Sequence, residues 1–242
     1  MGTGPRSSEQ SETATITGVL ELGPFITIEG VDGSGKTTQL HYLAERLRTA
    51  GERVTVTREP GGTALGDGLR RLLLEPSPEP IAPAAELAMM FAARAQNCAR
   101  IIEPARQRGE WVLCDRFSDA SLAYQGAGRG IDSNTIRQLH ELLVPSCYPD
   151  LTLILDVELS TSLKRARARL VRSGSQEGRF EAEGAAFFER VRAAYLELAR
   201  REPERCRLIE SAAPEQQVAE RIWHEVEAFA ATRRQSVRGQ AQ

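Results

Sequence analysis

The chain alternates between short apolar runs and longer segments in which apolar residues recur at helical spacing. Five runs are rich in apolar and β-branched residues, which is typical of buried strands. The first begins at Phe25, and the others lie at 53–57, 111–115, 151–156 and 206–210. Strands that are separated by helices throughout form a parallel sheet covered on both faces. The pattern therefore predicts a three-layer α/β fold around a five-stranded parallel sheet.

Helices are predicted where apolar residues recur every three to four positions. The predicted helices lie at 39–50, 65–74, 83–108, 132–144, 162–174, about 181–201 and 215–231. Pro104 predicts a kink or a late break in the helix at 83–108, because proline has no amide hydrogen. The polar segments at 1–20 and 233–242 predict a disordered extension and a frayed tail on either side of one domain at 21–232.

Composition narrows the expected partners and compartment. A net charge of −2 gives no electrostatic reason to expect a nucleic-acid or membrane partner. The four cysteines, at positions 98, 114, 147 and 206, have no metal-ligand spacing, which favours buried free thiols in a reducing compartment. The polar N-terminus lacks the apolar region of a signal peptide, and no apolar run is long enough for a membrane span. We therefore expect a cytoplasmic protein.

Candidate chemistry begins at Gly30–Thr37, GVDGSGKT, which follows the first apolar run and precedes a helix. It fits the pattern G-x-x-x-x-G-K-[ST], the P-loop, in which glycines let the backbone wrap around a phosphate. Lys36 is expected to reach the β- and γ-phosphates of ATP, and the Thr37 hydroxyl to ligate Mg²⁺. The expected nucleotide-binding residues are Gly30, Val31, Asp32, Gly33, Ser34, Gly35, Lys36, Thr37 and Thr38. The alternative is a glycine-rich strand-to-helix turn with an accidental lysine.

A P-loop alone fits motor ATPases, GTPases and small-molecule kinases. No NKxD-type segment follows a strand, which argues against a GTPase. The further segments are, in order, TREPGGT (57–63), FAARAQN (91–97), DRF (115–117) followed by AYQGAGRGID (123–132), and RARAR (165–169). With these segments the chain resembles the thymidylate kinase family, from Phe25 to about Ala231. The resemblance implies a P-loop kinase fold with a mobile lid at about 165–183, phosphorylation of dTMP by ATP, and a homodimer packed through long helices.

The resemblance also assigns residues to an acceptor site. In the family, a phenylalanine at the position of Phe91 stacks on thymine, and an arginine at that of Arg94 hydrogen-bonds its O4 edge. The expected dTMP-binding residues are Asp32, Glu59, Pro60, Arg70, Phe91, Arg94, Arg116, Ser121, Tyr124 and Gln125. Read without relatives, Phe91 is a core residue, whereas Arg94 and Arg70 are solvated helix arginines, and these alternatives stay open.

Asp115 and Arg116 follow an apolar strand and indicate phosphate chemistry. A carboxylate at that position holds Mg²⁺ directly or through water in P-loop enzymes, so Asp115 and Thr37 are the expected metal ligands. Arg116 offers two parallel N–H donors to the monophosphate of the acceptor.

Catalytic charge must also come from outside the P-loop, whose variable positions carry no arginine. Phosphoryl transfer needs cations beyond the P-loop lysine, and the arginine-rich lid resembles that of bacterial thymidylate kinases. We expect Lys36, Arg169 and Arg179 to be catalytic, with Arg167 as the alternative to either arginine. A solvated basic helix face is the competing interpretation. Gly178 departs from the family, in which an acidic residue precedes the arginine that Arg179 matches.

Together these expectations describe in-line transfer of the γ-phosphoryl group of ATP to a phosphate oxygen of dTMP. A phosphate monoester is already anionic near neutral pH, so positioning and charge neutralisation suffice without a strong general base. One rival is a kinase for another nucleoside or monophosphate. The other is a regulatory or motor-like ATPase without an acceptor.

Overall fold

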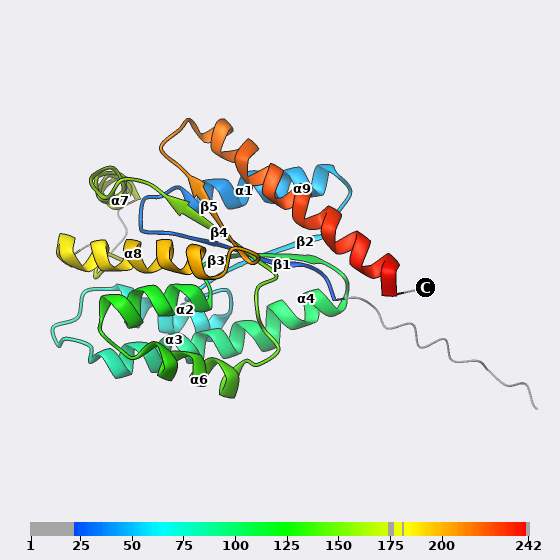
Figure 1. Ribbon diagram of the computed structural model, residues 1–242. Helices are drawn as coiled ribbons and strands as arrows, with labels where there is room; N and C mark the ends of the chain where they lie inside the picture. The colour runs from blue at the N-terminus through cyan, green and yellow to red at the C-terminus, as the bar shows by residue number, and fades with distance from the viewer. Residues whose placement is uncertain (1–21, 174–176, 181, 241–242) are drawn as a thin grey trace, which may run out of the picture.

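The computed structural model describes residues 22–173, 177–180 and 182–240. At its centre lies a parallel sheet with the strand order β2–β3–β1–β4–β5 (Figure 1). The strands are β1 (Phe25–Glu29), β2 (Val54–Arg58), β3 (Trp111–Asp115), β4 (Leu151–Asp156) and β5 (Cys206–Glu210). Ile26 of β1 pairs with Leu113 of β3 on one side and with Leu151 of β4 on the other. The predicted α/β fold and its five-stranded parallel sheet are confirmed.

Helices cover both faces of this sheet (Figure 1). They are α1 (Lys36–Thr49), α2 (Ala64–Leu74), α3 (Pro83–Asn97), the π-helical turn η1 (Cys98–Ile102), α4 (Glu103–Gln107), α5 (Ser118–Ser121), the π-helical segment η2 (Leu122–Gly128), α6 (Ser133–Leu143), α7 (Leu159–Ser173), α8 (Ala185–Arg201) and α9 (Glu215–Gln240). The helices α1 and α9 lie on one face, and α3, α4 and α8 lie on the other.

The alternation of side chains along β1 explains why both faces are covered. Ile26 and Ile28 pack with Leu40 of α1, whereas Phe25 points to the opposite face and packs with Ile102 of η1. These side chains are all buried. A central parallel strand is buried on both faces, and this is why the run is almost continuously apolar.

The carboxyl ends of β1, β2 and β3 meet at one edge of the sheet. Asp115, the last residue of β3, pairs with Ile28 of β1 and with Arg58 of β2. β1 lies between β3 and β4. The connection from β1 to β2 crosses the face covered by α1, whereas the connection from β3 to β4 crosses the other face, so a crevice forms beyond these strand ends. The sheet therefore brings three sequence-distant segments together, namely the P-loop, the loop after β2 and the residues after β3.

The helix predicted at 83–108 is present, but its geometry changes along its length. The α-helical hydrogen bonding of α3 gives way to the π-helical turn η1 before α4 begins. Pro104 lies in the first turn of α4, where a missing amide hydrogen disturbs the hydrogen bonding least. A π-helical turn therefore stands where the sequence predicts a kink.

Other parts of the secondary structure also differ from the predictions, and α1 and α7 begin at Lys36 and Leu159 rather than at 39 and 162. The segment 116–131, for which no element is predicted, contains α5 and η2, whose short glycine-containing sequence hides any helical period. The helix α8 begins at Ala185 rather than at about 181. The frayed tail predicted from 233 is wrong as far as Gln240, because α9 continues to that residue. The predicted extension at 1–20 lies outside the described residues and stays a prediction.

All four cysteines are buried and free, as predicted. None of the helices in the described part of the chain is both long enough and apolar enough to cross a membrane.

Candidate active site

The P-loop joins β1 to α1, and its shape depends on glycines with positive φ. The φ angles of Gly30, Gly33 and Gly35 are 134°, 82° and 101°. A Cβ atom on Gly33 would lie 2.0 Å from the carbonyl oxygen of Ser162 in α7, so only glycine fits there. The helix α1 begins at Lys36 with no side chain capping its first turn. The amide groups of that turn are therefore free to bind an anion.

Lys36 is buried, and its ammonium group lies against the loop to which it belongs. Its Nζ donates to the carbonyl oxygens of Gly30 at 3.1 Å and Val31 at 2.9 Å. Burial lowers the pKa of Lys36 to about 8, and the charge of Arg116 contributes in the same direction. A phosphate bound in the loop would favour the charged form of Lys36 and so counteract this shift.

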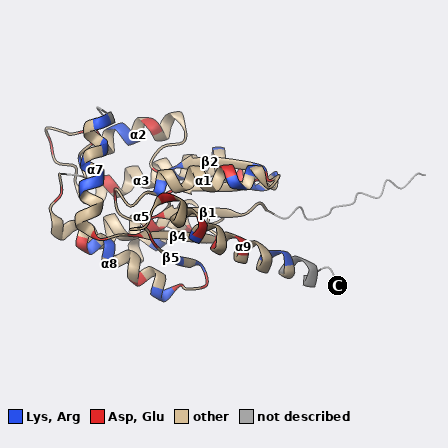
Figure 2. Cartoon of the chain, turned by 90° about the horizontal axis from the view of Figure 1, so that it is seen from above, with Lys and Arg blue, Asp and Glu red and all other residues tan. Residues whose placement is uncertain are grey.

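A cleft of about 510 Å³ opens over the P-loop, within the usual size range for small-molecule sites. We call it the donor cleft. Besides P-loop residues, it is lined by Arg165, Arg169 and Arg172 of α7 and by Ser211, Ala213, Glu215 and Val218. Basic residues gather along α7 when the molecule is viewed from above (Figure 2). Of the predicted lid arginines, Arg169 therefore reaches the donor cleft, whereas Arg167 is exposed and is not part of its lining.

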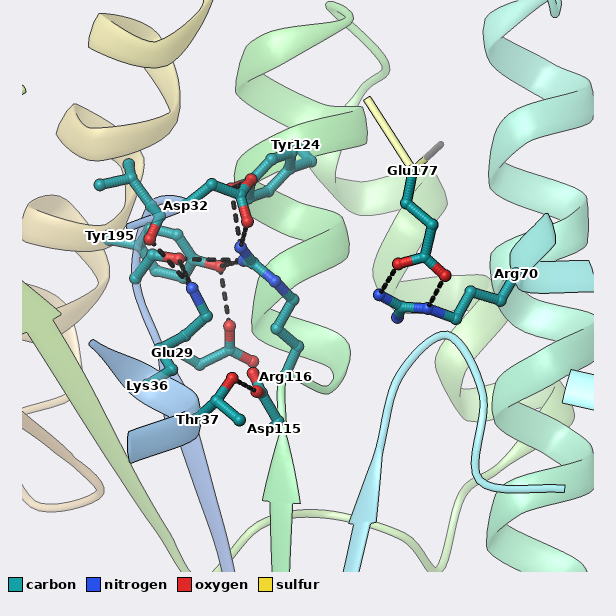
Figure 3. A network of polar contacts seen from close by, with 12 residues as sticks. Glu29, Asp32, Lys36, Thr37, Arg70, Asp115, Arg116, Tyr124, Glu177 and Tyr195 are labelled. Carbon is teal, nitrogen blue, oxygen red and sulfur yellow. Dashed lines mark hydrogen bonds and ion pairs between the residues drawn. The ribbon is translucent and has the colours of Figure 1, made fainter. Parts of the chain in front are cut away.

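Thr37 and Asp115, the two predicted metal ligands, lie side by side. The Thr37 Oγ1 donates to the Asp115 Oδ2 at 2.8 Å (Figure 3). Thr37 stands in the first turn of α1, and Asp115 ends the neighbouring strand β3. A hydroxyl beside a carboxylate suits Mg²⁺, which takes few protein ligands and completes its octahedron with phosphate and water oxygens. The donor set therefore fits this ion.

Arg116 lies between the P-loop and the helices beyond it. Its φ of 69° falls in the left-handed region, which is uncommon for a residue other than glycine. Nη2 donates to the Asp32 carboxylate and the Tyr124 hydroxyl, each at 2.9 Å. Nη1 donates to the Gly30 carbonyl at 3.0 Å and the Tyr195 hydroxyl at 3.2 Å (Figure 3). One guanidinium thus contacts both the P-loop and α8.

Asp32, inside the P-loop, also faces away from the donor cleft toward Arg116 and Tyr124. The Tyr124 hydroxyl donates to its Oδ2 at 3.0 Å. Burial on its own would raise the pKa of Asp32, but the charges of Arg116 and Lys36 outweigh burial and hold that pKa well below its usual range. Asp32 is therefore ionised at neutral pH and fixes the orientation of Arg116.

A second buried carboxyl group lies beneath Arg116. Glu29, the last residue of β1, accepts hydrogen bonds from the Phe117 amide at 2.6 Å and the Tyr195 hydroxyl at 2.7 Å. Burial raises the pKa of Glu29 to about 7, and the charge of Asp119 adds to this effect.

Arg94 of α3 and Glu59, which follows β2, form a fully buried ion pair with an Nε–Oε2 distance of 2.8 Å. Arg94 also donates to the Phe117 carbonyl at 3.0 Å and the Ser121 hydroxyl at 2.9 Å. Its Nη1 has no hydrogen-bond partner among the described residues. Arg94 is therefore no surface charge, and it keeps a buried donor, although Arg94 itself does not line the pocket beside Arg116.

Phe91 and Gln125 are placed differently from one another. Phe91 belongs to an apolar cluster, with its ring centre 4.7 Å from the Arg94 Cζ. It does not line the small pocket that lies beside Arg116. The structure thus places Phe91 in the core beside Arg94. Gln125 does line the pocket; it donates to the Glu86 carboxylate at 2.8 Å, and its own oxygen has no partner among the described residues.

The acceptor pocket, as we call the space beside Arg116, measures only about 80 Å³. This is well below the several hundred Å³ of typical ligand sites. The lining residues are Asp32, Glu59, Pro60, Arg70, Leu74, Met90, Arg116, Ala120, Tyr124, Gln125 and Phe180. Phe180, which follows α7, stands edge-on to Tyr124 with ring centres 5.5 Å apart. The Phe180 ring thus narrows the pocket.

Arg70 of α2 holds a carboxylate from this same segment. Its Nε and Nη2 donate to the two oxygens of Glu177 at 2.8 Å and 2.7 Å, and its Nη1 donates to the Pro60 carbonyl at 3.0 Å (Figure 3). Paired donors of this kind also bind phosphate, so Arg70 is placed and oriented as an anion-binding group. Arg179 donates to the Glu86 carboxylate at 2.7 Å, at the acceptor side and not in the donor-cleft lining.

The sequence reasoning missed Glu29, Tyr195, Glu86, Glu177 and Phe180. Glu29 had a signal, because a charged residue ended an otherwise apolar buried strand just before the P-loop. Tyr195 lies in an amphipathic helix, where nothing distinguishes it from an ordinary core residue.

The fold, the P-loop and the adjoining arginine-lined pocket define the class of this protein as a P-loop kinase. A family model described as thymidylate kinase matches residues 28–222. The thymidylate kinase of Syntrophotalea carbinolica is 48% identical over 200 residues, covering 82% of this chain and 93% of that protein. The thymidylate kinase of Pseudomonas putida is 52% identical over 190 residues, covering 78% and 89%.

A solved structure gives the same result. The crystal structure of thymidylate kinase from Ehrlichia chaffeensis is 34% identical, with a TM-score of 0.69, and the match covers 85% of this chain and 98% of that one. The chain belongs to the thymidylate kinase family.

Proposed function

We propose that this chain transfers the γ-phosphoryl group of ATP to dTMP, giving dTDP and ADP. The observation that carries the proposal is the position of Arg116. It contacts the donor loop through Gly30 and Asp32, and the acceptor pocket through Tyr124. A phosphate bound by Arg116 would therefore lie next to a phosphate bound by the P-loop. This is the proximity that phosphoryl transfer between two nucleotides requires.

The acceptor phosphate is the nucleophile in this reaction. Its oxygens are anionic near neutral pH, so they need orientation and not deprotonation. Arg116 and Arg70 can bind that phosphate with paired N–H donors, while Lys36 and the α7 arginines neutralise the transferred group. Closure of the segment after α7 over both nucleotides would exclude water and prevent hydrolysis of ATP.

Thr37 and Asp115 would hold Mg²⁺, and their 2.8 Å contact supports this assignment. When bound, the ion supplies positive charge next to the β- and γ-phosphate oxygens.

Among the lid arginines we favour Arg169 for the donor phosphates, because it lines the donor cleft. Arg179 contacts Glu86 in this structure, so a catalytic role for it requires that the lid segment move. Arg167 stays the alternative to either residue.

Selection of thymine and deoxyribose is part of the same proposal. Arg94 Nη1 and the Gln125 oxygen, which have no partner within the described part of the chain, would supply one donor and one acceptor for the edge of a base. The Tyr124 ring lies against Phe180 and under the Arg116 guanidinium, and we assign it to the sugar. Ser121 acts through Arg94, to which it is bonded.

We also propose a homodimer in the cytoplasm. The apolar side chains Leu87 and Met90 of α3 belong to the core, whereas Ala85, Ala88 and Ala92 are exposed at helical spacing and leave a small-residue surface for a second copy. Light scattering on the purified chain tests the dimer. The four free buried cysteines support a reducing compartment.

The activity is tested by ADP formation in a coupled assay with Mg²⁺-ATP and dTMP, dUMP, dCMP, thymidine or no acceptor. We expect the highest kcat/KM with dTMP. A preference for dCMP or thymidine would establish the rival kinase activity instead. ADP formation that is independent of any acceptor would establish a stand-alone ATPase.

A further inference from the structure

The orientation of Arg116 depends on a contact from outside the P-loop and the acceptor pocket. The Tyr195 hydroxyl accepts from Arg116 Nη1 at 3.2 Å, on the side of the guanidinium opposite to the Asp32 and Tyr124 contacts. Tyr195 belongs to α8, the helix that follows the lid segment, and is 2% exposed. Its ring is packed in an apolar cluster, so the hydroxyl has little freedom to move away.

A hydroxyl accepts from a guanidinium most favourably when its own hydrogen is directed elsewhere. In this structure the hydrogen of Tyr195 has a defined acceptor, because the hydroxyl donates to Glu29 Oε2 at 2.7 Å. The other oxygen of Glu29 accepts from the Phe117 amide, the residue directly after Arg116. Glu29 thus connects the side-chain contact of Arg116 to the backbone that carries Arg116.

Burying the Glu29 carboxyl group costs free energy, because the group loses its hydration. Glu29 is fully buried, and both of its hydrogen-bond partners are uncharged groups. A buried carboxyl group held in this way is destabilising relative to an apolar side chain of similar size. Glu29 lies next to Arg116, the arginine that contacts both the P-loop and the acceptor pocket.

We propose that Tyr195 and Glu29 form a positioning pair that orients Arg116 toward the phosphate of the acceptor nucleotide. The inference rests on the proposed function, because it assigns Arg116 to that phosphate. The Tyr195 hydroxyl oxygen accepts from Arg116 Nη1 and so holds it in place, and Glu29 orients that hydroxyl by accepting its hydrogen. Neither residue touches the substrate.

The test is Tyr195→Phe, which removes the hydroxyl and keeps the buried ring. Because one hydrogen bond to a charged group is lost, KM for dTMP should rise about tenfold. KM for ATP should stay near its wild-type value, whereas the melting temperature should fall by a few degrees, because Glu29 Oε2 loses the hydroxyl that donates to it. Tyr148→Phe is the matched control, because the Tyr148 hydroxyl donates to the exposed Glu141 and makes no contact with Arg116 or Glu29. It should leave both constants unchanged.

Binding measurements separate positioning from a general structural role. Calorimetry should show that Tyr195→Phe weakens binding of dTMP about tenfold but leaves binding of thymidine, which has no phosphate, unchanged. If the affinities for dTMP and thymidine fall by the same factor, or if neither falls in the folded variant, the positioning role is wrong. If the wild-type chain does not phosphorylate dTMP at all, the proposed function fails first, which is a different result.

A second variant tests whether the two residues act as one unit. Glu29→Gln keeps the shape of the side chain but has only one acceptor oxygen, so it cannot accept from both the Tyr195 hydroxyl and the Phe117 amide. The double variant with Tyr195→Phe should bind dTMP no more weakly than the worse single variant, because both changes remove the same contact. Effects that multiply would show two independent roles and would overturn the pairing.

Discussion

The donor cleft and the acceptor pocket differ in what builds them. The donor loop is a contiguous stretch, Gly30–Thr37, whose backbone conformation and helix N-terminus form the anion site. The acceptor pocket is built mostly from side chains of α2, α3, α5, η2, the residues that follow β2 and β3, and Phe180, and the P-loop contributes Asp32. The first has a volume of about 510 Å³ and the second of only about 80 Å³. A backbone site is present before its ligand arrives, whereas a side-chain site can be filled by the protein itself.

The largest expected effect comes from removing the one side-chain cation of the donor loop. Lys36→Ala should lower kcat about a thousandfold, because the charge that neutralises the transferred phosphate is lost. Binding of dTMP, measured by calorimetry without ATP, should change little if the two sites are as separate as their construction indicates. Turnover near the wild-type rate would show that Lys36 has no catalytic role.

A smaller loss is expected on the acceptor side. Arg116→Lys keeps the positive charge but loses the planar guanidinium that reaches Asp32, Tyr124 and Tyr195 at once. We expect kcat/KM for dTMP to fall about a hundredfold, with the ATP affinity largely retained. Arg48→Lys, on the exposed end of α1, is the control for a generic arginine replacement. An equal fall in ATP affinity would mean that Arg116 serves both sites.

The raised pKa of Glu29, a buried side chain behind Arg116, should make the free energy of unfolding depend on pH. Burial raises the pKa of Glu29 to about 7, whereas the unfolded carboxyl group titrates near 4.5. Between these values the native state binds a proton that the unfolded state has lost. Stability therefore falls as pH rises from about 4.5 to 7, by about 3 kcal/mol at most for this group.

Glu29→Gln should remove that contribution. Denaturant unfolding at pH 5 and pH 8 should show that the wild type loses up to about 3 kcal/mol more than the variant between the two pH values. Glu204→Gln, at an exposed carboxylate, is the control. Parallel pH profiles for wild type and Glu29→Gln would contradict a raised pKa at Glu29.

The smallest expected effect concerns the carboxylate that fills the acceptor side. Glu177 occupies Arg70 with two hydrogen bonds, and both side chains are partly exposed. Glu177→Gln should lower KM for dTMP about two- to fivefold, because the substrate phosphate no longer competes with a carboxylate and a partly exposed pair contributes little. Glu79→Gln, at an exposed carboxylate in the loop after α2, should have no effect. A higher KM in Glu177→Gln would instead make Glu177 part of the substrate site.

The same contrast explains what the sequence could predict. The strands, most of the helices and the P-loop follow from local patterns, because glycine spacing and apolar periodicity determine backbone conformation directly. Arg94 shows the limit: periodicity alone suggests a surface arginine, and only the packed structure shows it fully buried against Glu59. Tyr195 shows the same limit, since its contact with Arg116 joins residues 79 positions apart.

The family resemblance identified the acceptor residues, but not their packing or their hydrogen-bond partners. The placement of Phe91 in the core, the contact of Arg179 with Glu86 and the pairing of Arg70 with Glu177 all depend on how helices and the lid segment pack together. No short-range pattern records such contacts. The end of α9 was misplaced for a related reason, because polar residues continue a helix without leaving an apolar stripe.

The left-handed backbone of Arg116 has a consequence for engineering the stability of this enzyme. At a φ of 69°, glycine would relieve about 1 kcal/mol or more of steric strain. A design method that scores backbone geometry alone would therefore select glycine at this position. That substitution would also remove the guanidinium that neutralises the buried Asp32 carboxylate, and a buried carboxylate without its cation costs more than the strain relieved. The side-chain contacts of Arg116 thus compensate its strained backbone, and a search for thermostable variants has to hold this residue fixed.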